Sequence, residues 1–351
     1  MRASGARVDA LVVCARGGAA GAQAKGTIPT VTSFEPAGTA PEPFYADRAA
    51  LKRNFSRAAA TFSQGEALHR EIATRMLERL EYIKIDPARV LDLGSATGGA
   101  LPGLQARYPK AQLIALDIAH PMLRAAQPAQ APWHARLRAG LLGGSAGPLA
   151  VQADMAQLPF KGGAFQMVWS NLALHWLDDP APAIREAQRA LAVDGLFMFS
   201  ALGPDTLIEL REAFAAADPA GNPGWHVKRF IDLHDIGDVL VGAGFTTPVM
   251  DMEKITLTYE QLDGLFADLR ATGSGNALAG RARGLLGRGA MAKVKAAYEA
   301  RRARRSDARL PATFEVIYGH AWKGQPRRTA GGEAIVSFVP REHAPGGRPG
   351  R

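Results

Sequence analysis

The feature that most restricts the fold of this chain is a regular alternation of apolar runs and helical segments between residues 90 and 201. Five short apolar runs have the length and composition of strands, at residues 90–93, 112–116, 149–153, 165–170 and 196–201. Helical patterning lies between them, at residues 101–108, from Pro121 onward and at 183–191. Strands joined by helices of this length run parallel through right-handed crossovers. The pattern therefore predicts an α/β protein with a doubly wound, mostly parallel sheet, the Rossmann-like architecture.

Segments on either side of this core extend the prediction. Leu68, Ile72 and Met76 follow a helical spacing that predicts an amphipathic helix over residues 66–82. Later segments predict helices at 207–216 and 233–241 and extended runs at 249–259 and 313–322. Two late strands without a crossover between them favour an antiparallel edge on the sheet. The Pro- and Gly-rich stretch 125–147 is expected to be a surface loop.

Composition shifts suggest where the domain begins and ends. Residues 1–43 lack periodicity and are expected to be a disordered leader, and residues 341–351 a disordered tail. The domain is expected to span 44–340, with a cofactor-binding half at 66–201 and a substrate or cap half at 202–340. A single cysteine, Cys14, excludes a disulfide framework and a cysteine-based zinc cluster, and no metal site is predicted. No apolar run approaches the ~20 residues of a membrane helix, and the run 11–15 is too short for an export signal. A cytoplasmic protein is expected.

Acidic residues at successive strand ends point to the chemistry of the site. Asp92 lies two positions before Gly94, Asp117 ends the second strand, and Asp154 follows the third. Glycines in a strand-to-helix turn let the backbone approach a ligand, and open sheets bind ligands at the carboxyl ends of their strands. Asp92 would repel a pyrophosphate but suits the sulfonium and ammonium of S-adenosylmethionine. Any one of these Asp residues taken alone is better explained as a helix N-cap.

The three carboxylates together favour S-adenosylmethionine over a dinucleotide. The binding residues are expected at three strand ends and the loops that follow them: Asp92, Gly94, Ser95, Ala96, Gly98, Asp117, Ile118, Asp154, Met155 and Asn171.

The fourth strand end argues against methylation of DNA. The residues after Ser170 contain no acidic or polar residue followed by two prolines and an aromatic, the arrangement shared by enzymes that methylate exocyclic amines of bases. Methylation at cytosine carbon needs a cysteine nucleophile, and Cys14 lies outside the domain. His175 is either a general base or a pocket wall beside Trp176.

Several longer motifs extend the comparison to a family. The run 54–323 resembles the BioC-type malonyl-acyl carrier protein O-methyltransferases of biotin synthesis, especially their betaproteobacterial form. The resemblance rests on the Asp92 loop and on RAAA at 57–60, SNLALHW at 170–176, LGPDTL at 202–207, FIDLHDI at 230–236, MDME at 250–253 and FEVIYGHAWK at 314–323. It implies a class I methyltransferase that methylates the free carboxylate of a malonyl thioester, on carrier protein or coenzyme A, so that fatty-acid synthesis can elongate it toward pimeloyl.

Two departures from the family pattern concern the site. Ala96 stands where such enzymes usually have a second loop glycine, and Phe62 where they commonly have Tyr. Mitochondrial complex I assembly factors of the same fold, one of which hydroxylates an arginine, also look similar, through IVSF at 335–338. A methyltransferase-fold assembly factor or another small-molecule methyltransferase is therefore the alternative.

The acceptor that the resemblance implies sets the chemistry of the substrate pocket. A carboxylate with a pKa near ~4 is ionised at pH 7, so no general base is needed. Anion and sulfonium neutralise one another in the transition state, which favours a dry, well-ordered pocket. Phe62, Asn171, His175 and Trp176 are expected to line it. Arg57 and Arg211 are candidates for gripping the malonyl group, or else form surface ion pairs.

The net charge of +9 is concentrated in one late segment. Residues 281–309 carry ten basic and two acidic side chains, whereas 27–280 are mildly acidic overall. The segment is either a docking surface for an acidic acyl carrier protein or a solvated helix face. It lacks the interleaved aromatics of a nucleic-acid site, so no nucleic-acid partner is predicted. The docking candidates are Arg281, Arg283, Arg288, Lys293, Lys295, Arg301, Arg302, Arg304 and Arg305.

Overall fold

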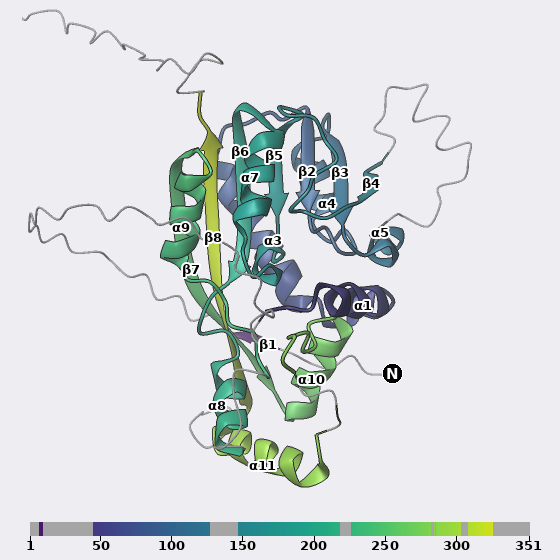
Figure 1. The fold of residues 1–351 in the computed structure, drawn as a ribbon, viewed down its shortest axis with the longest axis vertical. Coiled ribbons are helices and arrows are strands. Elements are labelled where there is room, and N and C mark those ends of the chain that lie inside the picture. The colour runs from purple at the N-terminus through teal and green to yellow at the C-terminus, as the bar shows by residue number, and fades with distance from the viewer. Residues whose placement is uncertain are drawn as a thin grey trace, which may run out of the picture.

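The computed structural model describes residues 7–9, 45–126, 147–217, 226–281, 284, 286–302 and 308–325. Their strands form one sheet in the order β1-β7-β8-β6-β5-β2-β3-β4 (Figure 1). The strands are β1 (Arg7–Asp9), β2 (Arg89–Leu93), β3 (Gln112–Asp117), β4 (Leu149–Gln152), β5 (Phe165–Ser170), β6 (Leu191–Leu202), β7 (Phe245–Tyr259) and β8 (Leu310–Lys323).

The direction of the strands confirms the expected fold class. β2 pairs parallel with β3 and β5, β3 with β4, and β5 with β6. β8 pairs antiparallel with both β6 and β7, which is the antiparallel edge that the two late extended runs predict. β1 adds an antiparallel pairing to β7. The rest of the expected leader and the expected tail lie outside the described residues.

Helices cover both faces of the sheet. One buried cluster joins the sheet to α3 and α4, and a second joins the opposite face to α7 and α9. The helices are α1 (Arg48–Ala58), α2 (Phe62–Gly65), α3 (Ala67–Arg79), α4 (Leu101–Arg107), α5 (His120–Ala126), α7 (Ala181–Ala190), α8 (Ile208–Ala217), α9 (Leu233–Gly242), α10 (Leu262–Ala271) and α11 (Arg288–Glu299), with 3₁₀ turns at Leu80–Tyr82 and Leu174–Trp176. No described helix combines the length and apolarity needed to cross a membrane.

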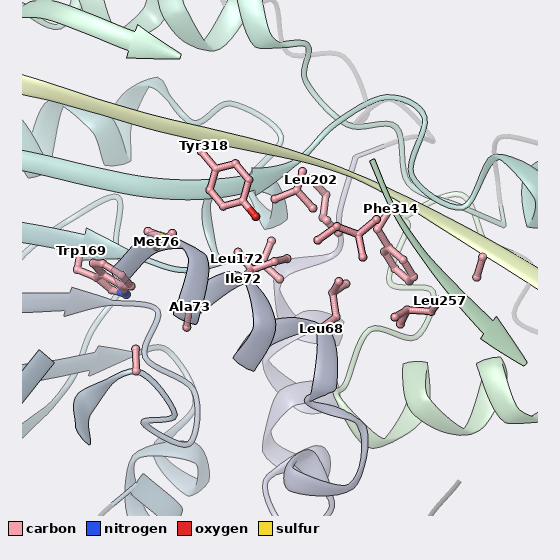
Figure 2. Packing of buried hydrophobic residues seen from close by; sticks show 14 of the residues in the cluster. Leu68, Ile72, Ala73, Met76, Trp169, Leu172, Leu202, Leu257, Phe314 and Tyr318 are labelled. Carbon is pink, nitrogen blue, oxygen red and sulfur yellow. The ribbon is translucent and has the colours of Figure 1, made fainter. Parts of the chain in front are cut away.

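α3 is the amphipathic helix that the apolar spacing predicts. Ile72 and Met76 have no exposed surface, and Leu68 is buried one turn earlier. Figure 2 shows these side chains facing Leu172 and Tyr318 beneath the sheet. This burial fixes α3, and with it the residues that α3 carries toward the carboxyl ends of the strands.

β7 and β8 continue past the parallel strands to a group of helices at one end of the molecule. Figure 1 shows α8, α10 and α11 gathered there, at the bottom of the view. The backbone N–H of Thr313 on β8 donates to Glu209 of α8 at 3.0 Å, and the hydroxyl of Tyr298 on α11 donates to the carbonyl of Pro311 at 2.6 Å. We call α8, α10 and α11 the helical lobe.

Two local predictions need correction or lie outside the structure. The strand expected at residues 196–201 begins earlier than predicted, because β6 already starts at Leu191. Asp194 does adopt a left-handed φ of 58°, and the pairing with β5 shifts register between Phe165 and Met167, so the residues form an irregularity inside the strand. Most of the expected surface loop, residues 127–146, lies outside the described residues.

Candidate active site

A cavity of about 260 Å³ lies at the carboxyl ends of the parallel strands. Its walls come from the loops after β2, β3, β4 and β5 and from α1. Parallel sheets place ligands at this edge because the loops there leave a crevice between them. We call this space the first cavity.

The loop after β2 is a tight turn that only glycine fits at two positions. Gly94 and Gly98 have φ values of 77° and 76°, in the left-handed region. A Cβ atom on Gly94 would lie 2.4 Å from the Cβ of Ala173. Ala96 also takes a left-handed φ, 46°, which an L-residue adopts only with strain. The backbone therefore approaches the cavity closely, with the methyl group of Ala96 in its wall.

Asp117 and Asp154 both line the first cavity. The oxygens of Asp117 accept hydrogen bonds from the backbone N–H groups of Ala96 at 3.0 Å and Ala119 at 2.8 Å. Burial raises the pKa of Asp117, and these backbone donors offset the effect only in part. Asp154 accepts from the backbone of Ala156 and forms an ion pair with Arg48 of α1 at 2.6 Å.

Asp92 lies close to Asp117 but does not line the cavity. Its side chain is only 2% exposed, and its Oδ2 has no hydrogen-bond partner within the described part of the chain. Burial, and after it the neighbouring Asp117, raises the pKa of Asp92 to about 8. The group is therefore mostly protonated at pH 7.

The other residues expected to bind the cofactor divide into two groups. Ile118, Met155 and Asn171 line the first cavity, together with Gly94 and Ala96. Ser95 and Gly98 do not, although Ser95 is buried and its hydroxyl has no partner among the described residues. Ser95 and Gly98 instead shape the turn.

α1 forms a wall of the first cavity that the sequence interpretation missed. Arg48, Leu51 and Phe55 face the space, and the ring of Phe55 meets that of Trp176 edge-on at 5.1 Å. The available signal was Asp47, an N-cap residue whose carboxylate accepts from the N–H of Ala50 at 2.9 Å. It predicts a helix start but not what the helix covers.

A second cavity, of about 380 Å³, lies between the carboxyl edge of the sheet and the helical lobe. Its lining is mostly apolar and includes Leu210 of α8, Leu265 of α10, Met291 of α11, Leu257 of β7 and Phe314 of β8. Four residues line both cavities, so the two spaces adjoin: Leu51, His69, Leu172 and Trp176.

The residues expected in the substrate pocket are only partly brought together. Phe62 and Asn171 line the first cavity, His175 the second, and Trp176 both. Arg57 is exposed and Arg211 points its guanidinium at the carbonyls of Pro204 and Thr206, and neither lines a cavity. The structure does not support either arginine as a residue that grips the malonyl group.

Two histidines adjoin the cavities, the half-buried His69 and the buried His175, and both are neutral at pH 7. Burial lowers the pKa of His69 to about 4 and also lowers that of His175, with Lys228 as a further cause. The Nδ1 of His175 faces the backbone N–H of Leu202 at 3.4 Å, whereas the Nδ1 of His69 is buried without a partner among the described residues. His69 was not among the residues expected from the sequence, because its helical position on α3 reads as part of an apolar face.

The basic segment is less free than its charge suggests. Four of its expected docking residues form ion pairs within the chain: Arg281 with Asp47, Lys295 with Asp263, Arg301 with Glu212 and Arg302 with Glu299. Arg288 and Lys293, both exposed on α11, pair with no carboxylate of the described residues. Arg283, Arg304 and Arg305 lie outside the described residues.

Known proteins with similar sequences show which family this chain belongs to. A family model described as a methyltransferase domain matches residues 91–199. The malonyl-[acyl-carrier protein] O-methyltransferase of Laribacter hongkongensis is 50% identical over 307 residues, covering 87% of this chain and 99% of that protein. Those of Gallionella capsiferriformans and Legionella pneumophila are 48% and 38% identical, covering 84% and 83% of this chain and 97% and 95% of theirs. Among solved structures, the YcgJ protein of Bacillus subtilis is 15% identical, with a TM-score of 0.47 over 73% of this chain and 99% of that one. The expected resemblance is thereby confirmed, and the chain belongs to the family of malonyl-[acyl-carrier protein] O-methyltransferases.

Proposed function

We propose that this chain transfers a methyl group from S-adenosylmethionine to the free carboxylate of a malonyl group carried on acyl carrier protein, in the pimeloyl branch of biotin synthesis. The observation that carries the proposal is the pair of adjoining cavities that share Leu51, His69, Leu172 and Trp176. A transfer reaction needs two bound molecules whose reacting atoms meet, and these four described residues belong to the walls of both spaces.

The first cavity suits the methyl donor. The Gly94 turn leaves room for a ligand against the backbone, and Asp117 and Asp154 supply negative charge toward a positively charged molecule. Bound S-adenosylmethionine would supply an electrophilic methyl group on a sulfonium.

The second cavity suits an acyl thioester whose carboxylate needs no base. Its apolar lining from the sheet and the helical lobe removes water from the acceptor. The residues at the junction carry no formal charge at pH 7, since burial keeps His69 neutral. An ionised carboxylate is therefore neither held in a strong ion pair nor hydrated at the junction, and it remains nucleophilic.

The carrier protein is proposed to dock beside the second cavity. α11 places Met291 in the cavity wall and exposes Arg288 and Lys293 on the same helix. Arg270 of α10 also lines the cavity and is exposed. These three cations form no ion pair with the described residues, so they are available to an acidic partner such as an acyl carrier protein. The docking surface is thus narrower than the whole basic segment.

The reaction is tested by incubating the full chain with labelled S-adenosylmethionine and either malonyl carrier protein or malonyl-coenzyme A. Formation of a base-labile methyl ester on the carrier protein, at higher kcat/KM than on coenzyme A, is the expected result. Binding of S-adenosylmethionine without transfer to either substrate would contradict the proposal and favour an assembly factor of the same fold.

The docking surface is tested by charge reversal. The double variant Arg288→Glu, Lys293→Glu is expected to raise KM for malonyl carrier protein and to leave KM for a small malonyl thioester unchanged. A matched control reverses Lys110 and Lys161, two exposed lysines on the loops that precede β3 and β5 at the amino edge of the sheet. Equal effects of the two double variants on the carrier-bound substrate would refute this surface.

A further inference from the structure

His69 is the only polar side chain other than Trp176 among the four residues that line both cavities. It lies on α3, one residue after Leu68, in the helix that Figure 2 shows packed beneath the sheet. The amide of Asn171 donates to the backbone carbonyl of His69 at 2.9 Å, and the ring of Phe62 meets the imidazole edge-on at 5.1 Å. Backbone and ring are therefore both held in place.

The imidazole has an unused hydrogen-bonding atom. The Nδ1 of His69 is buried and has no partner in the described part of the chain. Leaving a buried polar atom unpaired costs about 1–3 kcal/mol, so such atoms in a native protein call for an explanation. A ligand group that arrives at the junction supplies one.

The neighbouring polar groups are already engaged. Arg48 pairs with Asp154, and Lys228 donates to the carbonyls of Trp176 and Leu177 at 3.1 Å. His175 lines only the second of the two cavities, and its Nδ1 faces the N–H of Leu202. Leu51 and Leu172 offer no polar atom at all. Of the described side chains that line both cavities, His69 and Trp176 carry a ring nitrogen, and His69 is the one with a buried ring nitrogen that has no partner.

We propose that His69 binds the acceptor carboxylate at the junction of the two cavities, donating a hydrogen bond from Nδ1–H to one oxygen while the other oxygen faces the methyl group. The inference rests on the proposed function and assigns the residue that positions its substrate. In the step itself, the free oxygen forms a bond to the methyl carbon as the carbon–sulfur bond breaks. The carboxylate becomes a neutral ester, the sulfonium becomes a thioether, and no proton is transferred.

A neutral donor suits this step better than a cation would. A hydrogen bond from a neutral imidazole orients the carboxylate without the strong ground-state attraction of an arginine or lysine. The ester formed by the reaction is a weaker acceptor than the carboxylate, so the same contact also favours release of the product.

The test compares two substitutions at His69 by binding and by turnover. His69→Phe keeps a ring against Phe62 but removes both nitrogens, and His69→Asn keeps an N–H near the position of Nδ1. Binding is measured with S-adenosylhomocysteine present, using the N-acetylcysteamine thioester of malonate and the methyl ester of the same compound. The wild type is expected to bind the free acid at least 10-fold more tightly than the ester, and the Phe variant is expected to bind the two equally. The Asn variant is expected to recover most of the discrimination, and kcat/KM with malonyl carrier protein is expected to fall 10- to 100-fold in the Phe variant alone.

The outcomes separate this inference from the proposed function. A wild type that methylates malonyl carrier protein, together with a Phe variant that still discriminates acid from ester, refutes the role of His69 and leaves the function standing. A wild type that binds S-adenosylmethionine but methylates no malonyl thioester refutes the function itself. In a third outcome, both variants lose the discrimination between acid and ester while their thermal unfolding and their affinity for S-adenosylmethionine stay unchanged. In that outcome the packing of the ring, and not its hydrogen-bond donor, determines the discrimination, and the inference is refuted.

Discussion

The protonation state of Asp92 predicts that S-adenosylmethionine binds more tightly as the pH rises. Burial raises the pKa of Asp92 to about 8, so at pH 7 only about one molecule in ten carries the ionised form. A cation bound in the adjoining cavity favours that ionised form and lowers the pKa of Asp92 in the complex. Binding at neutral pH therefore releases a proton. Asp92→Asn removes the titrating group at nearly constant volume.

The size of the effect follows from the population of the ionised form. If the donor bound only molecules with ionised Asp92, its apparent affinity would fall about tenfold for each pH unit below 8. Between pH 7.5 and 6.0 the limit is about 25-fold, in a range where the donor's own ammonium group, with a pKa near ~7.7–8.0, stays mostly protonated. The same pKa shift lowers the free energy of unfolding of the wild type as the pH rises from about 4 to about 8. Over that range the folded state keeps a proton that the unfolded state has released.

Calorimetric titration of S-adenosylmethionine measures both quantities. In two buffers of different ionisation enthalpy at pH 6.5, the wild type is expected to release close to one proton per ligand, and Asp92→Asn close to none. Asp117 is present in both proteins, so its contribution cancels in the comparison. Equal proton release and equal pH slopes in the two proteins would refute the reasoning.

Three further substitutions test separate parts of the structure. Ala96→Gly relieves a left-handed conformation that costs an L-residue about 1–2 kcal/mol, and it adds about 0.5–1 kcal/mol of chain entropy in the unfolded state. Denaturant unfolding is expected to show a free energy of unfolding raised by up to about 1 kcal/mol. A lower free energy of unfolding would contradict the strain. Arg48→Ala removes an exposed ion pair and is expected to lower the free energy of unfolding by less than about 1 kcal/mol. The same variant is expected to speed dissociation of S-adenosylmethionine in stopped-flow measurements. An unchanged dissociation rate would mean that α1 does not retain the ligand. Gly319→Ala would place a Cβ atom 2.3 Å from Cζ of Phe199 and is expected to cost about 1–3 kcal/mol; an unchanged melting temperature would contradict the close packing.

Local patterns in the sequence were enough to predict the sheet and several of the residues that line the first cavity. Apolar runs that end in glycine or aspartate predict both a strand and the edge at which it ends, which is why Gly94, Asp117 and Asp154 could be found without a structure. Arg48 and Leu51 could not, because nothing in their own segment says that α1 folds across a loop about 100 residues later. His69 was missed for a related reason: its place on an apolar helix face predicts burial, and only the tertiary structure reveals the two cavities that meet there.

The basic segment shows how far a charge count can mislead. A run of ten cations looks like one surface, yet Arg281, Lys295 and Arg301 neutralise acids elsewhere in the chain, and Arg302 pairs with Glu299 inside the segment. Ion pairs between distant segments depend on the fold, so the sequence alone cannot separate cations that hold the structure together from those left for a partner.

The long strands β7 and β8 have a mechanical consequence. At about 3.3 Å per residue each strand is roughly 45–50 Å long. Each is a single continuous strand, and together they reach from the parallel strands to α8 and α11. A twisted two-stranded ribbon of that length resists bending, so it holds the helical lobe, and with it the far wall of the second cavity, at a fixed distance from the parallel strands.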